Sequence, residues 1–193
     1  MATTDDDALA GKKRKLEEEY FRKQDQELIE RMRKAAASAR QREELEARTG
    51  LHDPELLRDL QELGFTAETV PLLPLMPLVQ VAWAEGGVSP QERALIVDLA
   101  RKRNIAAGSP ADRQLSEWLA HPPDANVFRR AERLIGAVLA AGSSAAADIT
   151  ADDLVKYCES IAAASGGILG IGKISAEERA AISHIASQLK ARR

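Results

Sequence analysis

Histidine and cysteine, on which a Ser or Cys hydrolytic triad depends, are scarce in this sequence. The candidates are the three histidines and the single cysteine, at His52, His121, His184 and Cys158. A Ser or Cys triad requires a histidine held next to the nucleophile, yet these histidines fall in an expected linker, at a helix end and on a helix face. The sequence therefore predicts no hydrolytic centre, and we expect a protein that is not an enzyme.

Two other stretches come close to phosphate-binding patterns. Residues 167–173, GILGIGK, nearly match GxxxxGK[ST], but Ile174 stands where a Mg²⁺-binding Ser or Thr is required, and no strand pattern precedes the loop. The basic run 12–15 is followed at once by the acidic run 17–19, which would repel the same phosphates. We therefore expect neither a nucleotide site nor nucleic acid as a partner.

An adjacent pair of aromatic residues, Tyr20 and Phe21, lies in a segment that is otherwise mostly charged. Exposed rings gain nothing from water, whereas each ring buried in a groove gains ~2 kcal/mol. We interpret the pair as an anchor for another molecule. Two alternatives stay open: the rings dock the helix on its own bundle, or the helix pairs with a second copy.

The segment that carries these rings is expected to be one long helix. Residues 12–47 contain no Pro or Gly, and acid-before-base pairs four residues apart, such as Glu18 and Arg22, recur along them. Residues 1–10 are small and acidic, so we expect them to be disordered. The predicted organisation is a tail at 1–10, a charged helical segment at 11–49 and a compact domain at 50–193.

After Gly50 the pattern changes to short amphipathic helices, and no convincing strand pattern appears. Aromatic residues make up only 4% of the chain, and a capping residue precedes a proline at Asp53, Ser89 and Ser109. The expected fold class is all-α. The expected helices of the domain span 54–63, 66–73, 75–85, 90–104, 110–120, 126–141, 151–164 and 176–191.

An internal repeat organises this domain. Residues 81–100 align with residues 161–186 if the six residues 168–173 are treated as an insertion. The alignment pairs the glycines 86–87 with 166–167, Ser89 with Ser175, and Glu92 with Glu178. Each copy is a helix, a glycine turn and a capped helix, so we expect two pseudo-repeated helix pairs.

The first copy includes AWAEGGVSPQER, which resembles the signature of the TerB family of tellurite-resistance proteins and of the related N-terminal domain of DjlA-type co-chaperones. The resemblance covers residues 53–193 and implies an all-helical domain of two pseudo-symmetric helix pairs. It also implies that acidic residues around the glycine turn bind a divalent metal such as calcium, here Glu85, Glu92 and Glu178. Alternatively, these glutamates are capping-box or solvated residues.

Residues 11–34, GKKRKLEEEYFRKQDQELIERMRK, resemble the inhibitory segment of the mitochondrial ATPase inhibitor family. The resemblance implies insertion of this helix between catalytic subunits of a rotary ATP synthase. One glutamate would pair with an arginine of the partner, the two rings would fill a pocket, and aliphatic residues would continue the contact. The implied partner-binding residues are Glu17, Tyr20, Phe21, Arg22, Leu28, Ile29 and Met32.

Two hypotheses for function follow. In the first, a regulatory protein engages and inhibits an ATPase through its N-terminal helix, and the TerB-like domain is a scaffold or sensor. In the second, the domain is a metal-responsive stress protein of the tellurite-resistance type, and the helix is a tether. The longest apolar stretch, 70–84, is too short to span a bilayer, and a lone cysteine suits a reducing compartment, so we expect a cytoplasmic protein.

Overall fold

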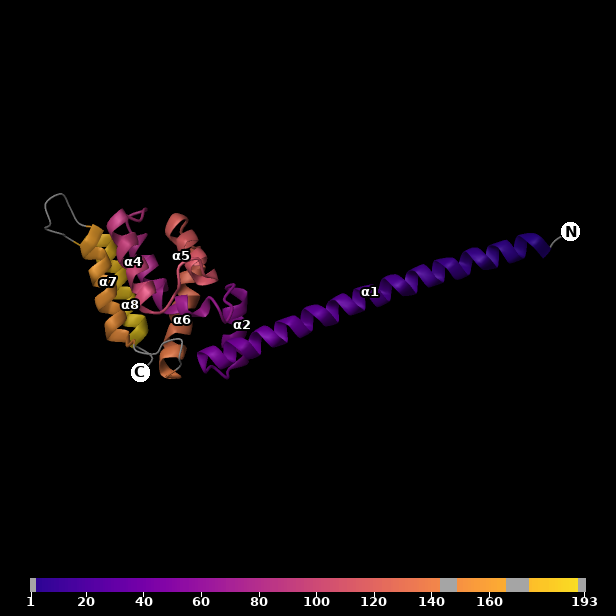
Figure 1. Cartoon of the computed structure of the whole chain (residues 1–193), viewed down its shortest axis with the longest axis horizontal. Coiled ribbons are helices and arrows are strands. Elements are labelled where there is room, and N and C mark those ends of the chain that lie inside the picture. The colour runs from indigo at the N-terminus through magenta and orange to yellow at the C-terminus, as the bar shows by residue number, and fades with distance from the viewer. Residues whose placement is uncertain (1–2, 143–148, 166–173, 191–193) are drawn as a thin grey trace. The chain divides into compact units, whose positions relative to one another are not determined.

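A computed structural model of the chain describes residues 3–142, 149–165 and 174–190, and every regular element in these ranges is a helix. The all-α class predicted from the sequence is confirmed. The helices, shown in Figure 1, are α1 (Thr3–Thr49), α2 (Pro54–Glu62), α3 (Met76–Ala82), α4 (Pro90–Lys102), α5 (Pro110–Ala120), α6 (Ala125–Ala140), α7 (Ala151–Ser165) and α8 (Ala176–Lys190), with a 3₁₀ helix, η1, at Val70–Leu75.

The chain divides into two compact units, residues 1–40 and residues 41–193. Helix α1 crosses this boundary, so its last turns belong to the second unit. Leu45 and Thr49 in those turns are fully buried, and the side-chain amide of Gln41 donates a hydrogen bond of 3.2 Å to the carbonyl oxygen of Phe65. The compact domain therefore starts near residue 41, earlier than the expected residue 50, because Leu45 supplies an apolar anchor at the end of the helix.

Helix α1 also starts earlier than expected. We predicted disorder for residues 1–10 and a helix from about residue 11, but the helix begins at Thr3.

The core of the second unit is organised around α3. This short helix packs against α4, α6, α7 and α8, and most of its residues, among them Leu78, Val79 and Val81, are fully buried. A helix that is apolar around its whole circumference is stable only when other elements surround it. Figure 1 shows α7 and α8 running alongside each other, with α4 next to α7.

Local capping explains where the other helices begin. The side chains of Asp53, Ser89 and Ser109 each accept a hydrogen bond from a backbone N–H in the first turn of the helix that follows. Gly86 adopts a φ of 83° in the turn between α3 and α4, a conformation that residues with a Cβ rarely tolerate. The predicted sequence of helix, glycine turn and capped helix is confirmed for the first repeat.

The helix predicted at 66–73 is wrong. Instead, Thr66 and Thr69 form a turn in which the backbone N–H of each donates to the side-chain oxygen of the other. The 3₁₀ helix η1 then follows from residue 70. Pro71 and Pro74 lack the backbone N–H that a continuous α-helix needs, and they disfavour the α conformation at the residues before them.

Candidate functional site

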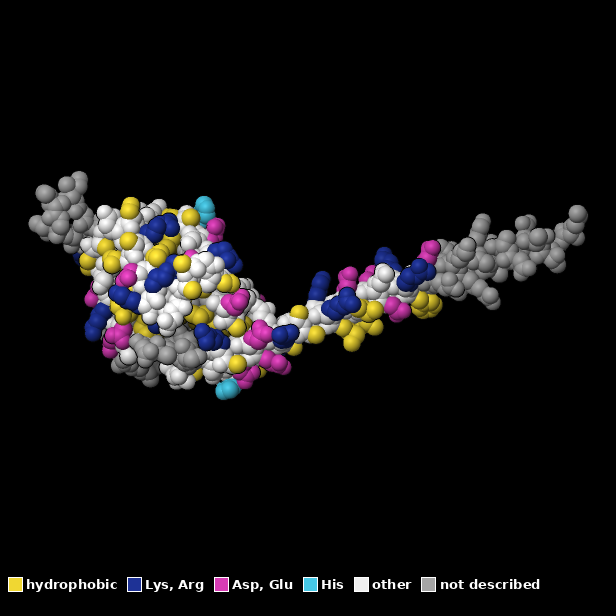
Figure 2. Space-filling view, viewed as in Figure 1, with side chains coloured by type: hydrophobic (Ala, Val, Ile, Leu, Met, Phe, Trp, Pro, Cys, Tyr) yellow, Lys and Arg dark blue, Asp and Glu magenta, His cyan; other side chains and the backbone are white. Residues whose placement is uncertain are grey.

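Helix α1 presents large apolar side chains to the solvent. Among the side chains that the structure describes, six large hydrophobic ones are exposed, and five of these lie on this helix, with exposed fractions between 48% and 64%. Figure 2 shows the yellow apolar side chains gathered along one side of the helix. The five residues, which we call the apolar face, are Tyr20, Phe21, Leu28, Ile29 and Met32.

The apolar face has the geometry of a helical contact surface. Phe21, Leu28 and Met32 are seven and then four residues apart, so they lie on nearly the same line along the helix. Tyr20 and Ile29 flank this line on its two sides. The rings of Tyr20 and Phe21 contact each other edge to face, with centroids 5.9 Å apart, which is a favourable arrangement for an aromatic pair.

The remaining predicted partner-binding residues are polar. Arg22 is exposed directly after the aromatic pair. Glu17 belongs to the helical backbone of α1, and its side chain lies outside the described part of the chain. Lys23 and Glu30 are exposed on the side of the helix opposite Phe21 and Leu28. The helix is therefore charged around most of its circumference, and its large apolar residues are concentrated on one face.

Of the three glutamates predicted as metal ligands, Glu85 and Glu178 each lie within electrostatic range of Glu92. Burial raises the pKa of Glu92 above its ordinary value, hydrogen bonds from Ser89 act in the opposite direction, and the charges of Glu178 and Glu85 raise the pKa further. Glu92 and Glu178 are 2% and 1% exposed, whereas Glu85 is exposed. The fold has therefore brought together residues from both copies of the repeat.

The two buried glutamates are used by capping boxes. The backbone N–H of Ser89 donates to Oε2 of Glu92 at 2.7 Å, and that of Ser175 donates to Oε2 of Glu178 at 2.8 Å. In return, each serine Oγ accepts from the backbone N–H of its glutamate, at 3.2 and 3.1 Å. Both copies of the repeat thus start their second helix with the same hydrogen bonds.

These bonds limit what the glutamates offer to a cation, because one oxygen of each already accepts a backbone N–H. In the described ranges, no group of three or more His, Cys, Asp or Glu side chains is arranged to hold a metal ion. The glycine turn of the second repeat and the predicted insertion 168–173 lie outside those ranges. Metal binding through Glu85, Glu92 and Glu178 stays a prediction.

Three of the four residues considered for catalysis are either buried or next to a carboxylate of the chain. Cys158 is buried, and burial raises the pKa of its thiol to about 12, so the thiolate nucleophile is suppressed. Nε2 of His184 lies 3.2 Å from a carboxylate oxygen of the buried Glu132, and Nδ1 of His52 lies 2.7 Å from Glu46. The absence of enzymatic activity stays a prediction.

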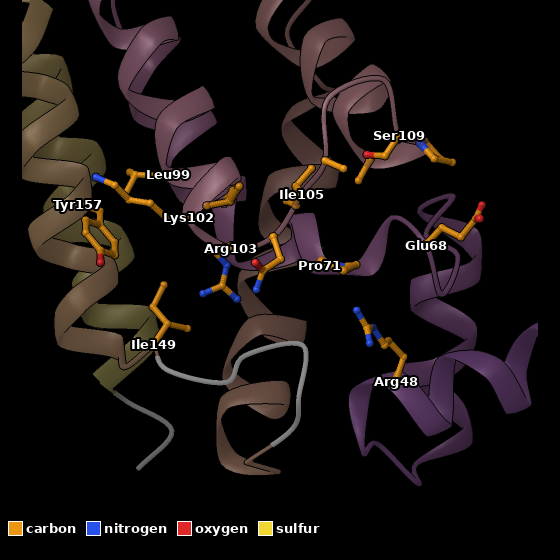
Figure 3. A pocket seen from close by; sticks show the side chains of 15 residues that line it. Arg48, Glu68, Pro71, Leu99, Lys102, Arg103, Ile105, Ser109, Ile149 and Tyr157 are labelled. Carbon is orange, nitrogen blue, oxygen red and sulfur yellow. The ribbon is translucent and has the colours of Figure 1, made fainter.

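The second unit contains a cavity that was not predicted from the sequence. A cavity of about 480 Å³ is lined by residues from α1, η1, α4, α5, α7 and the adjoining loops. Figure 3 shows arginine side chains reaching it from α1 and from the end of α4. The only sequence signal is the basic run 101–103 at the end of a helix, which by itself is more typical of a solvated helix terminus.

No helix in the described part of the chain is long and apolar enough to cross a membrane.

Comparisons with known proteins assign the chain to no family. The resemblances to the TerB and ATPase inhibitor families stay expectations, because the chain matches no family model, no curated protein and no solved structure.

Proposed function

We propose that this chain is a regulatory binding protein whose N-terminal helix docks its apolar face into a groove of a larger protein. The observation that carries the proposal is the exposure of Tyr20, Phe21, Leu28, Ile29 and Met32 on a helix that is otherwise charged. Insertion of an amphipathic helix into a groove is a common mode of recognition.

The energetics support this use of the apolar face. Burying a large apolar side chain contributes about 1.5–3 kcal/mol, and aromatic residues are enriched among those that dominate binding energy. Tyr20 and Phe21 are already in contact with each other, so less conformational entropy is lost when a partner binds both rings. Charged residues around the rest of the helix keep the free protein soluble and form the polar rim of the contact.

The catalytic head of a rotary ATP synthase is the partner that we propose, with inhibition of ATP hydrolysis as the outcome. The support is the local resemblance of residues 11–34 to the mitochondrial ATPase inhibitor family, in which Tyr20 and Phe21 would fill a pocket and Arg22 would lie beside them. The second unit would then act as a scaffold or sensor attached to the inhibitory helix.

The test is the ATPase activity of the host's catalytic head, measured with increasing amounts of the full chain. We expect inhibition by the wild type, and a loss of at least tenfold in potency for Tyr20→Ala with Phe21→Ala, because each ring anchors the contact. The matched control is Lys23→Ala with Glu30→Ala, which changes two exposed residues on the opposite side and leaves the net charge unchanged. Undiminished inhibition by the aromatic double variant would rule the proposal out.

A second candidate function is a metal-responsive role of the second unit. The charges of Glu178 and Glu85, which add to the larger effect of burial in raising the pKa of Glu92, favour it. Calcium would neutralise charges that repel one another, and calorimetric titration with calcium would then show saturable heat that Glu85→Gln weakens. No heat on addition of calcium would exclude this role.

A further inference from the structure

The cavity of the second unit is a distinct place where this protein can bind a ligand. Its volume of about 480 Å³ lies within the range of roughly 300–1,000 Å³ that is usual for small-molecule sites. The lining residues come from segments spread from residue 48 to residue 157. The cavity is therefore a product of the tertiary fold and not a surface feature of one helix.

One part of the cavity wall is apolar. Pro71 and Leu75 belong to η1, Leu99 to α4, Ile105 to the loop after it, and Ile149 to the segment before α7. Leu75 and Ile105 are buried, while Leu99 is partly buried against the core. This wall can hold the hydrocarbon part of a ligand, since removing apolar surface from water is favourable.

The other part of the wall is cationic. Arg48, Lys102 and Arg103 line the cavity against one acidic residue, Glu68. Figure 3 shows Arg48 entering from the end of α1 and Arg103 from the residue that follows α4. The Lys102 ammonium group is 2.6 Å from Asp98, so its charge is offset locally. Both arginines also interact with other groups of the chain, and a ligand would add a partner to each.

The N-terminus of α5 adds to this field. Ser109, Pro110 and Ala111 line the cavity at the start of that helix, where the macrodipole places partial positive charge that Asp112 in the first turn partly offsets. The lining therefore holds more basic than acidic side chains. That excess favours an anion, and the planar guanidinium fork matches the geometry of carboxylates and phosphates.

We propose that this cavity binds a small amphipathic carboxylate, with its head group at Arg48 and Arg103 and its hydrocarbon part against Leu99, Ile105 and Ile149. A free inorganic anion would leave the apolar wall unused, and an amphipathic cation would meet two guanidinium groups. The cavity shares no lining residue with the apolar face of α1, so the two proposals can be tested separately.

The test is isothermal titration calorimetry of the full chain with octanoate, octylamine and inorganic phosphate. We expect saturable binding of octanoate alone. Arg48→Gln should weaken octanoate binding by about tenfold, because a charge-assisted hydrogen bond is lost. Arg48 is exposed, so this variant is expected to fold. Arg58→Gln, an exposed arginine of α2 outside the cavity, is the matched control and should bind as the wild type does.

A second measurement needs no variant in the cavity. Titration of the wild type with octanoate should shift the backbone amide resonances of residues 99–106 in NMR spectra, and Tyr20→Ala with Phe21→Ala should leave these shifts unchanged. The proposal is overturned if octanoate does not saturate, if octylamine or phosphate binds as tightly, if Arg48→Gln has no effect, or if the amides of 99–106 do not respond.

Discussion

Glu92 and Glu178 are carboxylates in a place where charge is normally costly. Burying an ionised carboxylate is unfavourable unless its oxygens are hydrogen-bonded, and each of these glutamates accepts the backbone N–H of its own N-cap serine. The cost is offset only in part at Glu92, since burial still raises its pKa. Folding and protonation are therefore coupled at Glu92.

This coupling predicts a pH dependence of stability. The pKa of Glu92 is raised in the folded state above its ordinary value of 4.5, so the folded state holds the proton at a higher pH than the unfolded state does. The stability contributed by protonation is fully present below 4.5 and is lost as the pH rises through the raised pKa.

The measurement compares the wild type with Glu92→Gln by urea denaturation at several pH values. As the pH falls from neutral toward the ordinary glutamate value, the free energy of unfolding of the wild type should rise relative to that of the variant. Taking the difference in the free energy of unfolding between the two proteins cancels the contributions of the other titrating groups. A difference that stays constant or moves the other way would contradict the assigned effect of burial.

The residues of the candidate sites were predictable to different degrees. The capping boxes at Ser89 and Ser175 depend on a spacing of three residues, so the sequence alone located them. The scarcity of apolar neighbours drew attention to Tyr20 and Phe21, but the sequence left open whether the rings are exposed or dock on the chain's own bundle. The cavity around Arg48 and Arg103 was not predictable, because it depends on how distant segments pack and no local pattern encodes that.

The two capped helices, α4 and α8, should lose similar stability when their caps are removed. The hydrogen bonds at Ser89 and at Ser175 have nearly the same lengths in both copies of the repeat. Substitution of an N-cap serine by alanine typically costs about 1 kcal/mol. We therefore expect Ser89→Ala and Ser175→Ala each to lower the free energy of unfolding by about that amount, measured by chemical denaturation.

Ser116→Ala is the matched control, since Ser116 is an exposed residue within α5 and not a cap. It should leave the stability nearly unchanged or raise it slightly, because alanine is the better helix former. If the cap variants behave like this control, the capping boxes do not stabilise α4 and α8.

Helix boundaries were predictable where capping residues and glycines fix them, as at Asp53 and Gly86. They were not predictable at 66–73, where Pro71 and Pro74 sit in an apolar run that resembles a buried helix but cannot form the α hydrogen bonds. The extension of α1 into the second unit was also missed, because a single buried leucine, Leu45, gives no periodic signal. Local patterns thus identified most helices. The structure of residues 66–73 and the packing of the last turns of α1 depend instead on tertiary contacts.

The division of the chain at residues 40 and 41 predicts how truncations behave. A protein lacking residues 1–40 should keep the thermal stability of the second unit, because Leu45 and Thr49 remain. A protein lacking residues 1–49 loses both buried residues, and deletion of a core leucine side chain alone typically costs about 2–5 kcal/mol. Differential scanning calorimetry of the two truncations checks this, and equal melting temperatures would place the boundary elsewhere.

The second unit is held together by charge as well as by its core. Arg130 of α6 donates from one guanidinium nitrogen to Asp59 at 2.8 Å and to Glu62 at 2.7 Å, both on α2, and Arg133 pairs with the same aspartate. This network attaches the short helix α2 to a long one. In the proposed function, the second unit would be the scaffold and the apolar face of α1 would be the binding surface.

Site-specific photo-crosslinking tests the binding role of that face most directly. A benzophenone side chain would replace Phe21 in one version of the full chain and Lys23 in another, and each would be irradiated in cells that make the protein. We expect a discrete adduct with one larger protein from position 21 and none from position 23, which lies on the charged side. Adducts of equal yield from both positions, or none from position 21, would contradict the proposal that the apolar face is a specific protein-binding surface.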